Sequence, residues 1–255
     1  MVRNAKDSSR AATGAAEGLP WGLVADLKMP FQFLWHVPQF GEVFRRTAAT
    51  TAGVRAQTSF EQLTPPADRA ACAAVLAEVR SHDAGFDLAA TARGVVRARQ
   101  IVDQARLAGD ASAARQVMSD GLWQVFVMIL DSRTAHDIRR QGTSTVVEAK
   151  VVAATRDQLA EQLRLRLKCS GERSEAAGEQ VLRGNAVPGI WHEDWIIRRS
   201  AAATTPEKGG VLSGTCPNCG AALDVGPDGS CGYCSALVLT SGQDWVVWSI
   251  EEEPW

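Results

Sequence analysis

Two pairs of cysteines near the end of the chain limit what it can fold into more than any other feature of the sequence. Cys216 and Cys219 form one Cys-x-x-Cys pair, Cys231 and Cys234 form a second, and eleven residues separate the two pairs. Two tight turns at this spacing can bring four thiolates around one tetrahedral Zn²⁺. Because four sulfur ligands leave no position for water or substrate, the sequence predicts a structural zinc site. A redox dithiol and a chance pairing of cysteines remain the alternatives.

The residues around the cysteines suit two tight turns joined by a hairpin. Gly220 and Gly232 are expected to permit the bent backbone of the two turns. Between them, Pro227-Asp228-Gly229 is a turn signal. We therefore predict a zinc ribbon, a module of about 40 residues that could hardly fold without its metal.

The charge of the ribbon bears on its partners. Residues 211–255 contain no Lys, Arg or His, although the formal net charge of the whole chain is only −2. Contact with nucleic-acid phosphates requires cations, so we expect no nucleic acid and a protein partner instead. The acidic residues of this segment are Asp224, Asp228, Asp244, Glu251, Glu252 and Glu253.

Length and hydropathy limit the class of protein further. The 255 residues suffice for one medium domain and one small module. No stretch of 18 apolar residues occurs, and the first residues do not read as a secretion signal, so we expect an unsecreted, cytoplasmic protein without a membrane span. Cys72 and Cys169 lie outside the two pairs, and we interpret them as small buried apolar residues.

Three regions are expected along the chain: an irregular arm at 1–65, an α+β domain at 66–205, and the ribbon with a final strand at 206–255. Aromatic residues alternate with prolines in the arm, so its helices must be short. Three roles stay open for the arm: it covers its own domain, it binds a protein partner, or it lies on the inner face of a membrane. The partner-binding candidates are Trp21, Phe31, Phe33, Trp35, Phe40, Phe44 and, outside the arm, Trp123.

Residues 67–142 have a helical pattern throughout. Asp87 and Gly109 suit the start and end of a long helix, Asp110 suits the cap of a short one, and Ser119 the cap of a third. The third helix is apolar almost all round between residues 122 and 130. One predicted face, which meets the sheet, contains Leu122, Val125, Phe126 and Ile129; the other contains Trp123, Val127 and Leu130 and needs cover from the arm, the ribbon or a second subunit.

After Gly142 the apolar period changes to two, which is typical of strands. We predict antiparallel strands at Val146–Ala154, Leu159–Cys169 and Gly189–Arg199, with a charged loop at 170–186. In the second strand, alternate residues face inward (Leu163, Leu165, Leu167) and outward (Arg164, Arg166, Lys168). Helices followed by strands indicate an α+β fold, with the helices packed on one face of a curved antiparallel sheet. A last strand, at 243–251, is apolar on both faces and is expected to dock on this domain, with its acids near the three outward cations.

Several motifs resemble those of bacterial proteins with a Tim forty-four-like domain, whose namesake is a subunit of the mitochondrial inner-membrane translocase. They are Leu76-Ala77-Glu78-Val79-Arg80, Gly85-Phe86-Asp87, Arg106-Leu107-Ala108-Gly109-Asp110, Met118-Ser119-Asp120-Gly121-Leu122, the Cys-Pro-x-Cys-Gly knuckle, and Ser241-Gly242-Gln243-Asp244-Trp245-Val246. The resemblance covers about residues 73–255 and implies the cone-shaped fold of the nuclear transport factor two-like group. The Trp-x-Phe-x-Arg strand of the family departs here at Ile197.

Few residues suit acid–base catalysis. His192 and Asp194 lie two apart on a predicted strand and so share a face, which is the one arrangement that could orient a general base. A solvated polar face explains this pair equally well. We therefore expect a non-catalytic adaptor or scaffold with structural zinc, and keep as the alternative a small-molecule-binding or enzymatic cone with a deep polar pocket.

Overall fold

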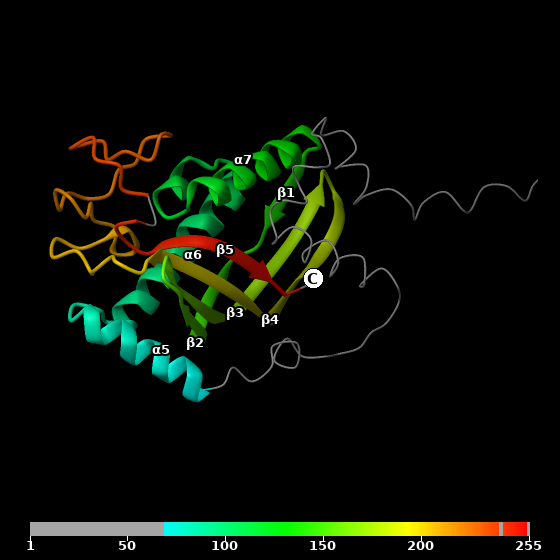
Figure 1. Ribbon diagram of the computed structural model, residues 1–255. Helices are drawn as coiled ribbons and strands as arrows, with labels where there is room; N and C mark the ends of the chain where they lie inside the picture. The colour runs from blue at the N-terminus through cyan, green and yellow to red at the C-terminus, as the bar shows by residue number, and fades with distance from the viewer. Residues whose placement is uncertain (1–68, 240–241, 254–255) are drawn as a thin grey trace, which may run out of the picture. The chain divides into compact units, whose positions relative to one another are not determined.

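The computed structural model describes residues 69–239 and 242–253, except for the side chains at 185 and 186. The helices come first in the chain and the strands follow (Figure 1). The helices are α5 (Arg69–His82), α6 (Leu88–Ala108), the 3₁₀ turn η1 (Ser112–Gln116) and α7 (Asp120–Ala135). The strands are β1 (Ile138–Gln141), β2 (Ser144–Arg156), β3 (Ala160–Ala177), β4 (Gln180–Ser200) and β5 (Val246–Glu252), with the 3₁₀ turn η2 (Val211–Ser213) before β5.

Local capping chemistry sets the helix ends as the sequence predicts. The carboxylate of Asp87 accepts hydrogen bonds from the backbone of Ala89 and Ala90, and Gly109 ends α6 with a left-handed φ of 69°. The Ser119 hydroxyl accepts from the backbone of Leu122 at the start of α7. The Asp110 carboxylate accepts from the Ser112 backbone, although the capping position of η1 is one residue later.

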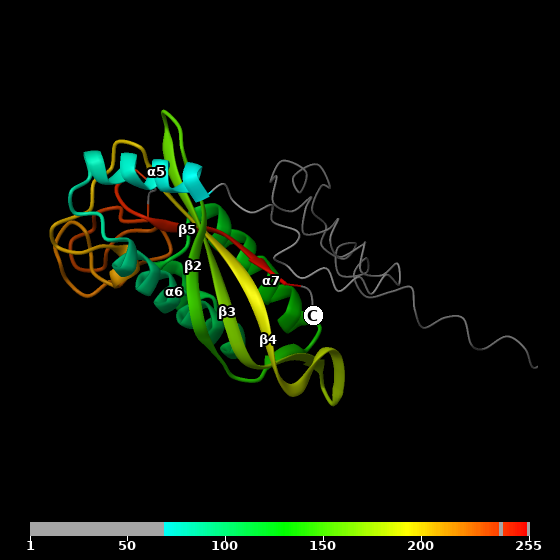
Figure 2. The same ribbon diagram turned by 90° about the horizontal axis from the view of Figure 1, so that it is seen from below.

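The five strands form one curved antiparallel sheet in the order β1-β3-β4-β5, with β2 also pairing with β3. The strands curl along their length, and α6 and α7 lie on one side of them (Figure 2). The prediction of an α+β fold with helices on a curved antiparallel sheet is confirmed.

The core lies between the inner face of the sheet and the helices. Leu163, Leu165 and Leu167 of β3 are fully buried, as predicted. They meet inward-facing residues of β4 and the apolar stripe of α6, which includes Val95, Ala98 and Val102. Cys169 is also fully buried in this core and Cys72 packs against it, which agrees with their interpretation as apolar residues.

Three details of the sequence prediction are wrong. The predicted loop at 170–186 is strand, because β3 continues to Ala177 and pairs directly with β4 around Gly178. The charged residues there pair across the sheet, as when Arg183 donates to Glu175, so a polar sequence does not mean a loop. The short strand β1 was included in the helical region, although it pairs with the end of β3.

The third error concerns α7. Phe126 and Leu130 are its buried residues, and Leu122 and Trp123 pack against the core. The face of α7 that packs on the core therefore contains Leu122, Phe126 and Leu130, although Leu130 was predicted on the opposite face. Trp123 is covered by its own chain, since the Arg115 guanidinium lies 5.1 Å from its ring centroid and its indole nitrogen donates to Ala111.

The remaining candidates in the arm lie outside the described residues: Trp21, Phe31, Phe33, Trp35, Phe40 and Phe44. No helix within the described ranges is both long and apolar enough to cross a membrane.

Candidate metal centre

The four cysteines of the two Cys-x-x-Cys pairs converge on one point. Their sulfur atoms all lie within 4.8 Å of one another. The Sγ atoms of Cys216 and Cys234 are 3.7 Å apart, and none of the four residues forms a disulfide. Four sulfurs at about 2.3 Å from a tetrahedral ion are about 3.8 Å from each other, so this cluster fits a metal site.

The two turns repeat one backbone pattern. In the first, Gly220 N donates to Cys216 O, and in the second Ser235 N donates to Cys231 O, both at 2.8 Å. Gly220 and Ser235, each directly after the second cysteine of its pair, have positive φ values of 78° and 58°. The expectation for Gly232 is therefore wrong, because the left-handed position of the second turn is occupied by Ser235, which accepts some backbone strain there.

The connection between the turns folds back as predicted. Gly229 N donates to Gly226 O, and Gly229 has a φ of 81°. The Asp228 carboxylate accepts from the backbone and hydroxyl of Ser230. The resulting short hairpin brings the second cysteine pair back toward the first.

Polar neighbours favour the thiolate form of one ligand. The Asn218 side-chain amide donates to Cys234 Sγ at 3.5 Å, and this bond is the largest of the effects that lower the pKa of Cys234 to about 6. At Cys219 the backbone of Ala221 lowers the pKa, but desolvation and the hydrogen bonds to the other three thiols outweigh it and raise the pKa of Cys219 to about 11. The ligands therefore differ in how readily they lose a proton, and metal binding must displace the proton held by Cys219.

The cysteine cluster has its own small core. Cys216 and Cys231 are buried with Val211, Val238, Leu239 and Val246, whereas Cys219 is exposed. Val246 belongs to β5, and its neighbour Val247 packs into the main core. The last strand is thus apolar on both faces, as predicted, because it separates two cores.

Three further contacts fix the cluster to the helices and the sheet. The buried Asp244 carboxylate accepts from the backbone of Val211 and Trp245, while burial raises the pKa of Asp244. Leu212 of η2 packs directly over Gly94 of α6. The Arg115 side chain donates to the Pro227 carbonyl in the hairpin.

The acidic residues of this segment do not form an acidic surface. Glu251 pairs with Arg164 at 3.1 Å, Glu252 pairs with arginines on the opposite face of the sheet, and Glu253 lies beside His192. The predicted contact between the final strand and Arg164 is confirmed. Asp224 and Asp228 alone among the six acids are exposed.

His192 and Asp194 do share a face of β4 but do not act on each other. The Asp194 carboxylate is fully buried and accepts from Arg166 at 2.8 Å and from Arg164 at 3.3 Å. His192 lies 3.5 Å from Glu253 instead. The carboxylate that would orient a general base is therefore held by two guanidinium groups.

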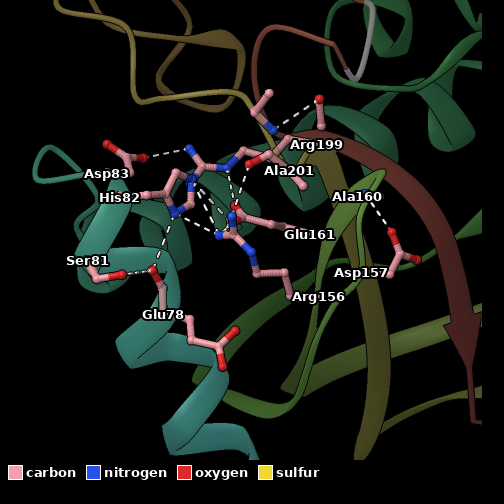
Figure 3. A network of polar contacts seen from close by, with 12 residues as sticks. Glu78, Ser81, His82, Asp83, Arg156, Asp157, Ala160, Glu161, Arg199 and Ala201 are labelled. Carbon is pink, nitrogen blue, oxygen red and sulfur yellow. Dashed lines mark hydrogen bonds and ion pairs between the residues drawn. The ribbon is translucent and has the colours of Figure 1, made fainter.

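A buried ionic network that the sequence did not reveal joins α5 to the sheet (Figure 3). The fully buried Arg199 donates to Glu161 and to Asp83, at 2.7 Å each. Arg156 donates to Glu161 from the other side, and His82 lies 3.4 Å from the same carboxylate. The network joins three separate parts of the chain, around residues 82–83, 156–161 and 199, so no local pattern could have identified it.

An open hollow of about 480 Å³ lies beside this network. It is lined by Glu78, Arg156, Asp157, Gln158, Ala201 and Ala202. Arg156 is engaged with Glu161, and the Asp157 carboxylate accepts from the backbone of Leu159 and Ala160. These groups serve structural roles in the turn between β2 and β3.

The geometry defines an α+β domain with a cluster of four cysteines that fits a metal site. The chain matches no protein-family model and shows no significant similarity to any curated protein with which it was compared.

Proposed function

We propose that the four cysteines hold one structural Zn²⁺ in a ribbon. The close approach of four sulfur atoms supports this, together with the absence of any fifth protein donor from the only His/Cys/Asp/Glu cluster of this kind within the described residues. Zinc favours tetrahedral thiolate sites and needs no redox chemistry to bind there. The ion would connect the two turns and so fix η2 and β5 to the main domain.

Metal analysis of the purified chain tests this proposal. One zinc per chain is expected in the wild-type protein, with a large loss in Cys219→Ser. Cys72→Ser is the matched control, since Cys72 lies on α5 outside the cluster and should leave the zinc content unchanged. Wild-type protein without bound transition metal, or equal zinc loss in both variants, would refute the site.

We further propose that the protein is a non-catalytic adaptor, with a Tim forty-four-like domain of the nuclear transport factor two-like cone class. The proposal rests on the observation that the candidate reactive groups already have partners within the chain. The four cysteines face one another in a cluster, and Asp194 forms ion pairs with Arg164 and Arg166. In this adaptor, the aromatic-rich arm at 1–65 is the segment that binds the partner. Its partner is a protein in the cytoplasm or at the inner face of a membrane.

The arm is tested by deletion. Pull-down with the intact chain and with a chain lacking residues 1–60 should recover the partner only with the intact chain. Liposome flotation of the same two proteins tests whether the arm binds the membrane itself, because a membrane-binding arm carries the intact chain alone to the top of the gradient. Equal behaviour of both proteins in both assays contradicts a binding role for the arm.

A further inference from the structure

The last turn of α5 ends on the buried ionic network that joins this helix to the sheet (Figure 3). The apolar attachment of α5 is small, because Leu76 and Val79 are its buried residues and Cys72 and Val75 are only partly buried against the core. The polar contacts of His82, the last residue of α5, therefore form a substantial part of the link between the helix and the strands.

The ring of His82 lies between an arginine and a carboxylate. Its Nδ1 atom is 2.7 Å from Nη1 of Arg156 at the end of β2, and its Nε2 atom is 3.4 Å from Oε1 of Glu161 on β3. The fully buried Glu161 also accepts from Arg199 of β4 at 2.7 Å. The imidazole thus bridges α5 to two neighbouring strands.

The contact with Arg156 requires an uncharged imidazole ring. A guanidinium group can only donate hydrogen bonds, so Nδ1 of His82 must accept from Arg156 and carry no proton. The single ring proton is then on Nε2, where it faces Glu161. Both ring nitrogens therefore have a partner in the sheet as long as the ring is neutral.

Protonation of the ring sets two donors against each other. A proton added to Nδ1 would face the Arg156 guanidinium, and two positive groups would meet at 2.7 Å. The attraction of Glu161 acts over the longer distance of 3.4 Å, and this carboxylate already pairs with Arg156 and Arg199. The charge nearest to the added proton is therefore positive.

The other acidic groups around His82 are held by partners of their own. Asp83, the next residue in the chain, accepts from Arg199 at 2.7 Å. Asp157, in the turn after β2, accepts from two backbone N–H groups of that turn. Neither carboxylate replaces the contact that a charged His82 would lose.

A charged ring has another acceptor within its own helix. The backbone carbonyl oxygen of Glu78 is 3.3 Å from Nδ1 of His82 and can accept only when that nitrogen carries a proton. A positive charge is also favoured in the last turn of a helix by the helix dipole. Arg156 lines the open hollow of about 480 Å³, which gives its side chain room to turn away.

We propose that His82 is a pH-sensitive contact that holds α5 on the sheet only while its ring is neutral. In mild acid the charged ring donates to the Glu78 carbonyl, Arg156 moves away, and the end of α5 loosens. Histidine is the side chain whose ordinary titration falls between pH 5 and 8, so a modest change of pH suffices. This inference stands apart from the zinc site and from the adaptor function.

Hydrogen exchange of the full chain at pH 7.5 and at pH 5.0, corrected for the intrinsic exchange rates, is the test. Protection in residues 76–86 is expected to be about tenfold lower at pH 5.0, which corresponds to the loss of one hydrogen bond to a charged group. The paired strands β3 and β4 are the internal reference and should keep their protection.

His82→Gln should remove this pH dependence, because the glutamine side chain can accept from Arg156 and donate to Glu161 without titrating. His136→Gln is the matched control. The exposed His136 follows the end of α7 and donates from Nδ1 to the Ser132 carbonyl four residues earlier, as a charged His82 would to Glu78. This control should keep the pH dependence of the wild-type protein.

The state of the ring is measured in the wild-type protein by nitrogen NMR of the histidine side chains. At pH 7.5 the single proton of His82 is expected on Nε2. A proton on Nδ1 at this pH would overturn the inference, as would equal loss of protection in His82→Gln and wild type. Protection in 76–86 that follows the reference strands at both pH values would also overturn it.

Discussion

At the scale of single residues, buried charged side chains such as Asp83 contribute to the stability of the folded state. Asp83 is 2% exposed and accepts from Arg199 and from the backbone and hydroxyl of Thr205. Burial alone would raise the pKa of Asp83, but the hydrogen bonds from Arg199 and Thr205 outweigh it and hold the pKa below its usual value. The ionised carboxylate therefore stabilises the folded state.

Asp83→Asn should lower the free energy of unfolding by about 3 kcal/mol at pH 7, because it leaves the buried Arg199 with one carboxylate fewer. A depressed folded pKa gives stability that is present above the unfolded value near 4 and is lost as the pH falls through the folded pKa. The difference between the two proteins in urea unfolding should therefore shrink once the pH falls below the unfolded value and through the folded pKa of Asp83. Asp131→Asn, at an exposed position of α7, should match wild type at every pH.

Arg97 represents the opposite case, a partly buried cation that has no acidic partner among the described residues. Its Nη1 atom is buried and makes no hydrogen bond, Nη2 donates to Gln116, and burial lowers the pKa of Arg97. Arg97→Met should therefore be neutral or raise the free energy of unfolding by about 1 kcal/mol. Arg93→Met, at a 72% exposed site on the same helix, serves as the control in urea unfolding. A loss of stability in Arg97→Met alone would show that the cation has a compensating partner.

At the scale of elements, the contact between α6 and η2 depends on one missing methyl group. A Cβ atom built on Gly94 would lie 2.7 Å from Cβ of Leu212 and 3.1 Å from its carbonyl oxygen. Separations below about 3.5 Å between carbons are repulsive, so the two elements cannot stay in place if Gly94 gains a side chain.

Gly94→Ala should lower the free energy of unfolding by about 2 kcal/mol in urea, because the gain in helix propensity is smaller than the cost of overpacking. Gly121→Ala is the matched control, since no atom lies within 4 Å of its added Cβ in α7. It should be stabilising by about 0.5 kcal/mol. Equal effects of the two substitutions would contradict the close packing of η2 on α6.

The sequence predicted the ends of elements best where one residue forms hydrogen bonds to residues only a few positions away. Asp87, Gly109, Ser119 and the turn at Pro227 were predicted because capping and turn chemistry act over two to four residues. The strand residues after Ser170 were not, because their charges are satisfied only across the sheet, as between Arg183 and Glu175. Cross-strand partners are set by register, and register is not visible in a single strand.

At the scale of the whole molecule, the segment with the cysteine cluster contacts helices that lie far away in the sequence, through Leu212 on Gly94 and Pro227 on Arg115. The cysteine pairs were predicted from spacing alone, and their convergence is confirmed. The contact of the final strand's acids with Arg164 was predicted and is made by Glu251, whereas the pairing of Glu252 with Arg140 was not predicted. Long-range ion pairs of this kind need three-dimensional positions before they can be recognised.

Removal of the proposed zinc ion should loosen more than the segment that contains the four cysteines. A strong chelator is expected to abolish hydrogen-exchange protection in 211–239 and to lower it in β5, because Val246 of β5 packs in the core of the cysteine cluster. Metal ligation of this type contributes about 10–16 kcal/mol in isolated zinc-finger peptides. The pair β2 and β3 should stay protected, since their pairing does not involve the cluster. Uniform loss of protection, or none at all, would contradict this division.

Glu251 and Glu252 are adjacent in β5 yet serve opposite sides of the sheet, with Arg164 on one side and Arg106 and Arg140 on the other. Because side chains alternate along a strand, insertion of a single amino acid just before this pair would send each carboxylate to the wrong side. A one-codon insertion at this point of the strand should therefore break the ion pairs on both sides of the sheet. A two-residue insertion would keep the phase of the side chains but displace both from their arginines.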